Sequence, residues 1–171
     1  MKPEDLVRTP MEMLDPEERI HNFDEVEVGY TKEEAIKEAN RCLQCKIPNC
    51  MKGCPVGHHI PEWIKALRED RLDDAYKIID EVSALPAICG RVCPQEQQCE
   101  KMCVRGVKGQ AISIGALERY VADHANRVKE TAPKEKNGHK VAIVGSGPSG
   151  LTCAVDLARL GYDVTIYEAL H

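Results

Sequence analysis

The chain has 171 residues and a formal net charge of −5, and its residues are 43% hydrophobic but only 4% aromatic. The acidic balance argues against nucleic acid or an anionic membrane surface as the main partner. No apolar run approaches membrane-spanning length, and the start, MKPEDLVRTP, lacks a signal-peptide core, so we expect a cytoplasmic chain. In that compartment, nine cysteines favour metal ligation over disulfides.

The first part of the chain predicts an arm followed by helices. Residues 1–30 are rich in proline and acidic side chains, and we expect an extended arm that wraps another surface. Thr31 and Glu34 form a capping-box pattern, which predicts a helix that runs to Cys42. Further helices are predicted over 60–70, 71–82 and 110–128. Their inward-facing residues are Trp63, Ile64 and Leu67; Leu72, Ala75, Ile78 and Ile79; and Ile114, Leu117, Val121 and Val128.

The last part of the chain predicts a different structure. Residues 129–139 are charged and turn-prone, which indicates a linker between a helical domain over 31–128 and a second domain over 140–171. VAIVG and DVTIYE are predicted strands, and the helix between them ends before Gly161. One β-α-β unit does not complete a doubly wound sheet. We therefore expect an N-terminal piece of a longer polypeptide, inactive by itself.

Eight of the cysteines fall into two short runs. Their spacings are C-x2-C-x4-C-x3-C-P from Cys42 and C-x3-C-P-x4-C-x3-C from Cys89. A [4Fe–4S] cluster needs four ligands, usually thiolates, and spacings of two to four let one loop supply three of them. Because proline turns the chain away, we expect Cys54, before Pro55, to ligate a different cluster from the cysteines preceding it. The ninth, Cys153, is expected to be an inert core residue.

Two zinc sites are the main alternative, since zinc also takes four thiolates. His58 and His59 follow the first run and would then be candidate ligands, although a solvated loop pair is the simpler interpretation. The corresponding function would be a zinc-stabilised interaction module fused to a nucleotide-binding domain. Within the iron–sulfur interpretation, counting alone makes two sets of four cysteines, with Cys89 included.

A dinucleotide-binding fingerprint lies between the two predicted strands. Its glycines permit a tight turn, approach of a pyrophosphate and close helix–strand packing, and the helix N-terminus favours phosphate. An acidic residue at the end of the second strand would accept hydrogen bonds from a ribose and would repel a 2′-phosphate, which favours FAD or NAD over NADP. The residues concerned are Gly145, Ser146, Gly147, Pro148, Ser149, Gly150 and Glu168.

These motifs together resemble the glutamate synthase small-subunit family. Its relatives include the large subunit of NADH-dependent ferredoxin:NADP oxidoreductase and the N-terminal part of dihydropyrimidine dehydrogenase. The matching stretches are GYTKEEAIKEANRCLQCKIPNCMKGCPVGHHIPEWI, ALPAICGRVCPQEQQCEKMCVRG, ISIGALERY and VAIVGSGPSGLTCAVDLARLGYDVTIYEA. The resemblance implies a mainly α fold: a helical domain of the α-helical ferredoxin type with two [4Fe–4S] clusters, followed by a Rossmann-like FAD-binding domain, here only begun.

The resemblance also implies an electron route and two ligand sets. Electrons would pass from NAD(P)H to FAD, through the clusters, and on to a large catalytic subunit or another acceptor protein or domain, with oligomeric assembly allowed. No side chain is expected to act as a catalytic acid, base or nucleophile. One cluster would take Cys42, Cys45, Cys50 and Cys103, and the other Cys54, Cys93, Cys99 and Glu118, leaving Cys89 outside both sets.

The helical phase supports a special role for Glu118. It lies four residues after Ile114 and three before Val121, close to the apolar stripe, where an unpaired carboxylate is costly. A metal would be one partner. A salt bridge to Arg105 or Arg91 is the alternative.

Overall fold

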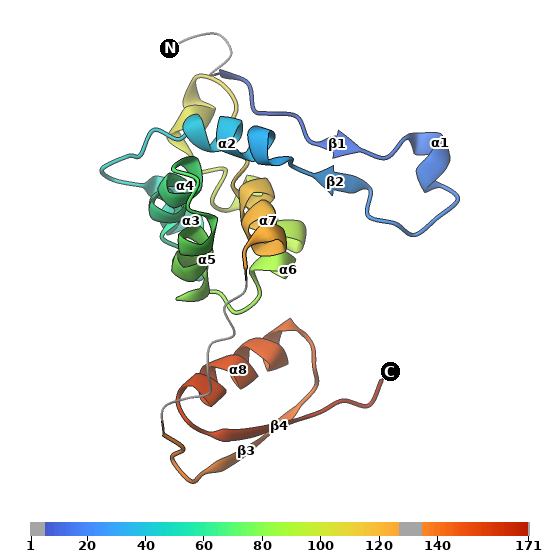
Figure 1. Cartoon of the computed structure of the whole chain (residues 1–171), viewed down its shortest axis with the longest axis vertical. Helices are drawn as coiled ribbons and strands as arrows, with labels where there is room; N and C mark the ends of the chain where they lie inside the picture. The colour runs from blue at the N-terminus through green and yellow to red at the C-terminus, as the bar shows by residue number, and fades with distance from the viewer. Residues whose placement is uncertain (1–5, 127–134, 171) are drawn as a thin grey trace. The chain divides into compact units, whose positions relative to one another are not determined.

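The computed structural model describes residues 6–126 and 135–170, which divide into two compact units (Figure 1). The first unit is mainly helical and holds eight of the nine cysteines. The second unit is a strand–helix–strand arrangement. The predicted fold class, mainly α with the start of a Rossmann-like domain, is confirmed. In the described ranges, no helix is long and apolar enough to cross a membrane.

The first unit is built from short elements. Its described α-helices are α1 (Pro16–Arg19), α2 (Lys32–Asn40), α3 (Asn49–Gly53), α4 (Ile60–Arg68), α5 (Leu72–Asp80), α6 (Pro86–Val92) and α7 (Ile114–His124). One 3-10 turn, η2 (Gln95–Gln97), lies in the second cysteine run, and another, η3 (Val104–Val107), directly follows it. The strands β1 (Glu12–Met13) and β2 (Glu27–Gly29) pair antiparallel. Cys89, the first residue of the second cysteine run, lies on α6.

Helix α2 begins at the predicted capping box. The Glu34 amide donates to the Thr31 hydroxyl over 3.3 Å, and the Thr31 amide donates to the Glu34 carboxylate over 2.8 Å. Both amides would otherwise lack partners at the start of the helix. Helix α2 ends at Asn40, so Cys42 lies two residues beyond its end.

The apolar stripes of α4, α5 and α7 meet in one core. Its fully buried residues include Trp63 and Ile64 of α4, Ala75 and Ile79 of α5, and Leu117 and Val121 of α7, as the helical periodicity predicts. Leu72 and Ile78 are only partly buried at its edge. Helix α7 is shorter than predicted, because the backbone turns extended at Ala125. Val128 lies outside the described residues.

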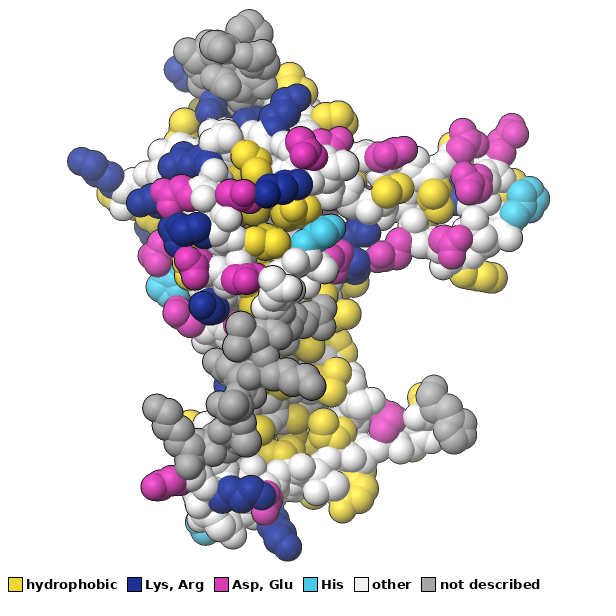
Figure 2. Space-filling view, viewed as in Figure 1, with side chains coloured by type: hydrophobic (Ala, Val, Ile, Leu, Met, Phe, Trp, Pro, Cys, Tyr) yellow, Lys and Arg dark blue, Asp and Glu magenta, His cyan; other side chains and the backbone are white. Residues whose placement is uncertain are grey.

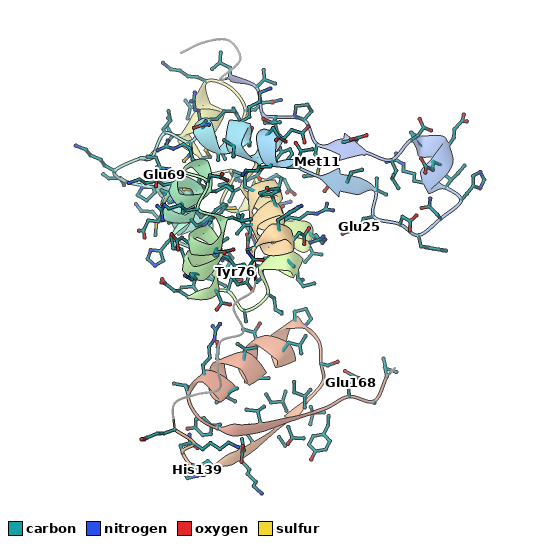
Figure 3. The ribbon with its side chains drawn as sticks, viewed as in Figure 1. Met11, Glu25, Glu69, Tyr76, His139 and Glu168 are labelled. Atoms are coloured by element: carbon teal, nitrogen blue, oxygen red, sulfur yellow. The ribbon has the colours of Figure 1, made fainter. Side chains whose placement is uncertain are left out.

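The N-terminal segment forms a hairpin arm, defined here as residues 12–29, which projects from the helices (Figure 1). Acidic side chains gather on the arm in Figure 2. Its base is tied to the helical core: Tyr30 donates to the Thr9 carbonyl over 2.6 Å, and Arg119 of α7 donates to the Glu27 carbonyl over 2.9 Å. Glu25, labelled in Figure 3, forms ion pairs with Arg91 and Arg119.

The second unit has the predicted β-α-β order. β3 (Lys140–Val144) and β4 (Asp163–Tyr167) are parallel, and α8 (Pro148–Arg159) connects them. Gly161 follows the helix with a φ of +91°, which only glycine adopts readily. Cys153 is exposed on α8, so its predicted burial in the core is wrong. The helical period placed it on a helix correctly but did not determine which face packs.

Candidate metal centre

The first cysteine group consists of Cys42, Cys45, Cys50 and Cys103. Cys42 follows α2, Cys50 lies on α3, and Cys103 precedes η3, so three separate segments supply the four thiols. All four line one pocket that encloses about 400 Å³ of empty space, part of it open to solvent. The apolar wall of the pocket includes Ile60, Ile64, Ile112 and Ile114. The Gln44 side-chain amide donates to the Cys42 sulfur over 3.4 Å.

A buried carboxylate and two arginines hold this group together. Glu38 is fully buried; its carboxylate accepts hydrogen bonds from the Thr9 amide (2.7 Å) and the Ser113 amide (3.0 Å), and it forms an ion pair with Arg41. Arg105 donates from Nε to the Arg41 carbonyl over 2.7 Å. Arg41 immediately precedes Cys42 and Arg105 is two residues after Cys103. These bonds therefore fix the two chain segments that carry those thiols.

The pocket disfavours bare thiolates. Burial, together with the neighbouring thiols of Cys103 and Cys42, raises the pKa of the Cys50 thiol to about 11. Burial likewise raises the pKa of the Cys42 thiol. A low-dielectric site with several thiols needs a cation if the sulfurs are to be ionised. This donor set fits a metal or an iron–sulfur cluster, in which thiolates bind iron.

The second cysteine group consists of Cys54, Cys93 and Cys99, with Glu118 beside them. Burial, together with the charges of Cys89, Glu118 and Cys54, raises the pKa of the Cys93 thiol to about 11. Burial, Glu100, Cys54 and Glu118 raise that of Cys99 to about 12. Because these groups affect one another's pKa values, the three thiols and the carboxylate lie close together. They are carried by four different elements, α3, α6, η2 and α7, or by the residues that follow them.

Glu118 is a buried carboxylate with an unmet oxygen. Its residue is 8% exposed, burial raises its pKa to about 8, and Oε1 has no hydrogen-bond partner among the described residues. Nε2 of His58 lies 3.7 Å from Oε1. Burial lowers the pKa of His58 to about 4, so near pH 7 both groups are neutral and the contact is not an ion pair. An unmet acceptor beside thiols fits a position in contact with a cation.

The predicted salt-bridge alternative for Glu118 is not seen in the described residues. Arg91 instead forms ion pairs with Glu25 and Asp123. Arg105 donates to a backbone carbonyl beside the first cysteine group. The buried carboxyl group of Glu118 therefore has no arginine partner among the described residues.

Cys89 lies next to the second group rather than apart from it. It is on α6 within hydrogen-bonding reach of Cys93, and it is only partly exposed. Cys89 and Glu118 thus both lie beside the second group. The difference between them as a completing ligand is the donor atom, a thiolate sulfur or a carboxylate oxygen. Among the described residues, no three His, Cys, Asp or Glu side chains converge on a point suited to a single metal ion.

The predicted nucleotide loop has the required backbone shape. Gly145 has a φ of +101°, and a Cβ at Gly150 would lie 2.1 Å from the Gly145 carbonyl oxygen, so both positions require glycine. A Cβ at Gly147 would meet nothing, which leaves that side open to a ligand. Ser146 lies in the same turn, and Ser149 lies in the first turn of α8.

Glu168, labelled in Figure 3, closes this loop. Its carboxylate accepts hydrogen bonds from the amide and the hydroxyl of Ser146, both over 2.8 Å. Backbone amides of Leu170 and Ser146 are the main reason that its pKa falls to about 2. The residue is therefore ionised, as the predicted ribose contact requires, but Ser146 engages Oε2 and the amides of Ala169 and Leu170 engage Oε1.

A protein-family model described as dihydropyrimidine dehydrogenase domain II, 4Fe-4S cluster, matches residues 19–130. The chain belongs to this family. A second model, an NAD(P)-binding Rossmann-like domain, matches residues 143–171. The two matches bring together the helical unit with its cysteines and the start of the strand–helix–strand unit.

Curated relatives extend the same combination. The chain is 40% identical over 156 residues to the glutamate synthase [NADPH] small chain of Azospirillum brasilense, covering 88% of this chain and 32% of that protein. It is 37% identical over 149 residues to the Escherichia coli small chain, covering 85% and 32%. A homologue of the NAD-dependent dihydropyrimidine dehydrogenase subunit PreT from Salmonella typhi is 40% identical over 148 residues, covering 85% and 36%. The chain thus spans about a third of the length of these relatives.

Two features of the site were missed by sequence reasoning. His58, interpreted as half of a solvated pair, is 3% exposed, whereas His59 is partly exposed. The available signal was its position two residues before the buried Ile60, the first residue of α4. The other is Glu38, which lies between the buried Ala35 and Ala39 on α2; its helical phase indicates burial and therefore a partner.

Proposed function

We propose that this chain is the electron-transfer part of an NAD(P)H- and FAD-dependent oxidoreductase subunit of the glutamate synthase small-subunit type. Two [4Fe–4S] clusters would be held by Cys42, Cys45, Cys50 and Cys103, and by Cys54, Cys93, Cys99 and Glu118. The observation that carries the proposal is the gathering of seven mostly part-buried thiols and one buried carboxylate into two groups within one helical unit. The unmet oxygen of Glu118 supports its place in the second set.

The residues of the chain would bind, insulate and position. When bound, clusters and flavin supply the one-electron and hydride chemistry, and the protein sets position and potential. The isoleucine wall gives the first thiols an apolar side, and Gln44 donates to the Cys42 sulfur. Hydrogen bonds to cluster sulfurs are among the factors that set reduction potential. Gly145 to Gly150 would hold the pyrophosphate of FAD, and Glu168 its ribose, in the complete domain.

The electron acceptor would be a large catalytic subunit or another protein or domain that is not part of this chain. The glutamate synthase small chains and the dihydropyrimidine dehydrogenase subunit among the relatives support such a partner. The final substrate differs between these relatives. It is therefore a property of the partner rather than of the residues described here.

Metal analysis tests the proposal against the zinc-stabilised module. Protein purified without oxygen should contain about eight irons and about eight sulfides per chain and absorb broadly near about 400 nm. Stoichiometric zinc without iron or sulfide in the same preparation would overturn the iron–sulfur assignment. Metal content decides the matter, since oxygen damage can bleach a cluster protein.

Paired substitutions test the ligands of the second group. We expect Glu118→Ala to reduce iron to about half, because one of two clusters loses a ligand, and Cys89→Ala to keep both clusters. Iron, sulfide and electron paramagnetic resonance of the reduced protein are the measurements. Cys45→Ala is the matched control, since it should damage the other cluster. Intact spectra in Glu118→Ala together with loss in Cys89→Ala would reverse the assignment.

A further inference from the structure

Charge is segregated around the first cysteine group. The two segments that supply most of its pocket lining, residues 39–61 and 101–117, contain no Asp or Glu, although the chain has 28 acidic residues and a net charge of −5. The exposed Glu62, between the lining residues Pro61 and Ile64, is the nearest acidic exception along the chain. The buried Arg41 and Arg105 in these segments are used inside the fold. The exposed cations that remain are Lys46, Lys52, Lys101 and Lys108.

These four lysines lie beside the pocket along the chain. Lys46 follows Cys45, and Lys101 precedes Met102, both of which line the pocket. The helix that ends with Lys52 and Gly53 packs on the second segment, because a Cβ at Gly53 would lie 2.9 Å from the Met102 side chain. None of the four lysines forms an ion pair with a described acidic side chain. Lys32, Lys77 and Lys136, in contrast, pair with aspartates elsewhere.

Exposed apolar side chains lie at the opening of the same pocket, which we call the mouth. Leu43, Met102 and Val104 line the pocket and are 50%, 42% and 42% exposed. Ile47 and Val107, close to them in sequence, are 71% and 79% exposed. An apolar centre with a charged rim is the usual composition of a protein–protein interface. A small anion would satisfy the lysines but would leave these apolar side chains in water.

We infer that this mouth is the docking surface for an electron-acceptor protein whose own docking face is acidic around an apolar centre. The inference rests on the proposed function, which supplies the electron to be transferred. It adds the position of the docking surface and the charge of the partner. Complementary charge steers encounter and fixes orientation, and the contact weakens as salt rises. A cluster held by the first cysteine group would supply one electron and the acceptor would take it up, with no bond made or broken. An acceptor seated here would lie over the thiols of the first group.

Two inert probes of opposite charge test the surface without the natural partner. Hexacyanochromate(III), an anion that exchanges no ligands, should broaden backbone amide signals of residues near Lys46 and Lys101, whereas hexaamminechromium(III) should not. In a second measurement, the dithionite-reduced protein is oxidised by ferricyanide or by tris(phenanthroline)cobalt(III) in a stopped-flow instrument. Ferricyanide oxidation should slow as salt rises, and the cationic oxidant should show the opposite trend.

Matched lysine variants locate the effect. At low salt, Lys46→Gln with Lys101→Gln should lower the ferricyanide rate constant about three- to tenfold and remove most of the broadening. Lys37→Gln with Lys77→Gln makes the same charge change on α2 and α5 and should have little effect on either. Equal rates in the two double variants, with iron content intact in both, would overturn the inference.

The remaining outcomes separate this inference from the proposed function. Protein without iron or sulfide would remove the proposed function, while hexacyanochromate broadening would still report the basic mouth. Salt-sensitive self-association that Lys46→Gln with Lys101→Gln abolishes would make the mouth an interface between copies, through their acidic arms, and would overturn acceptor docking. Binding of the wild-type protein to vesicles of anionic phospholipid through the same lysines would also overturn it.

Discussion

The two cysteine groups share one helical unit but are built in different ways. The first has four thiols in an apolar pocket, and the Glu38, Arg41 and Arg105 network fixes two of the segments that carry them. The second has three thiols, a buried carboxylate at Glu118 and a neutral histidine 3.7 Å from it. Similar cysteine spacing in a sequence thus conceals two different surroundings for the thiols.

The supports of the two groups also differ in where stability comes from. The first depends on the buried Glu38 carboxylate, which accepts hydrogen bonds from the backbone amides of Thr9 and Ser113. The second depends on the close packing of α6 against α7, because Cys89 and Cys93 lie on or just after α6 while Glu118 lies on α7. A substitution that disturbs one support should therefore affect one group more than the other.

Removing the buried carboxylate below the first group should have the largest effect. Glu38→Ala leaves Arg41 without its ion pair and the Thr9 and Ser113 amides without an acceptor. Breaking a buried pair costs about 3–5 kcal/mol of the free energy of unfolding. The measurement is the urea unfolding midpoint of anaerobic protein, with iron content after dilution. Glu33→Ala, exposed on the same helix, should change stability by less than about 0.5 kcal/mol. Similar midpoints for the two variants would contradict the role of Glu38.

Pushing α6 away from α7 should disturb the second group with an intermediate effect. A Cβ at Gly90 would lie 2.6 Å from the backbone nitrogen of Arg119, the neighbour of Glu118. Gly90→Ala should therefore cost about 1–3 kcal/mol, as overpacking does. It should also lower the iron that the second group retains.

Gly106→Ala is the matched control for this packing prediction. It lies near Cys103, and its Cβ would meet its nearest neighbour, Ala111, at 3.8 Å, an ordinary contact. Its urea midpoint and iron content should stay near those of the wild type. Equal loss of iron in both variants would show that helix separation does not distinguish the two groups.

Much of the fold follows from local sequence patterns. The capping box at Thr31, the stripe through Trp63 and Ile64, and the glycine turn at Gly145 are each determined by residues close together in the chain, and the structure has all of them. The end of α7 and the exposure of Cys153 were not predictable in this way. They depend on which surfaces pack, and a helical period cannot choose between faces.

The candidate site is less accessible from sequence than the fold. The positions of the cysteines indicate metal ligation, but their grouping depends on contacts between segments up to about sixty residues apart, such as Cys42 and Cys103. The resemblance supplied that grouping, and it stays a proposal. The burial of His58 was missed because its two polar nitrogens suggest a solvated loop, and only the packing around Glu118 places it inside.

The smallest expected effect concerns the hairpin arm, whose Glu25 forms ion pairs with Arg91 of α6 and Arg119 of α7. A hydrogen bond from Arg91 lowers the pKa of Glu25 below its ordinary value of 4.5. Burial is the largest single influence on Asp123 and raises its pKa, but the hydrogen bonds and charges of Arg91 and Arg119 together outweigh it, so the pKa of Asp123 also falls below its ordinary 3.8. Because both carboxylates have lowered pKa values in the folded state, their contribution is complete above pH 4.5 and is lost as the pH falls through the lowered values.

Acidification should therefore loosen the arm before it affects the first cysteine group. Glu25 is 57% exposed, so solvent screening limits the contribution to less than about 1 kcal/mol. Hydrogen exchange at the Leu14 amide, which donates to Val26 across the hairpin, measures the opening once intrinsic rates are corrected. Glu25→Gln should open the hairpin already at neutral pH and remove most of the acid dependence, while Glu12→Gln on β1 should behave like the wild type. Protection at Leu14 that is the same in all three proteins from neutral to acidic pH would mean that the arm is held by its backbone contacts at Tyr30 and Glu27 alone.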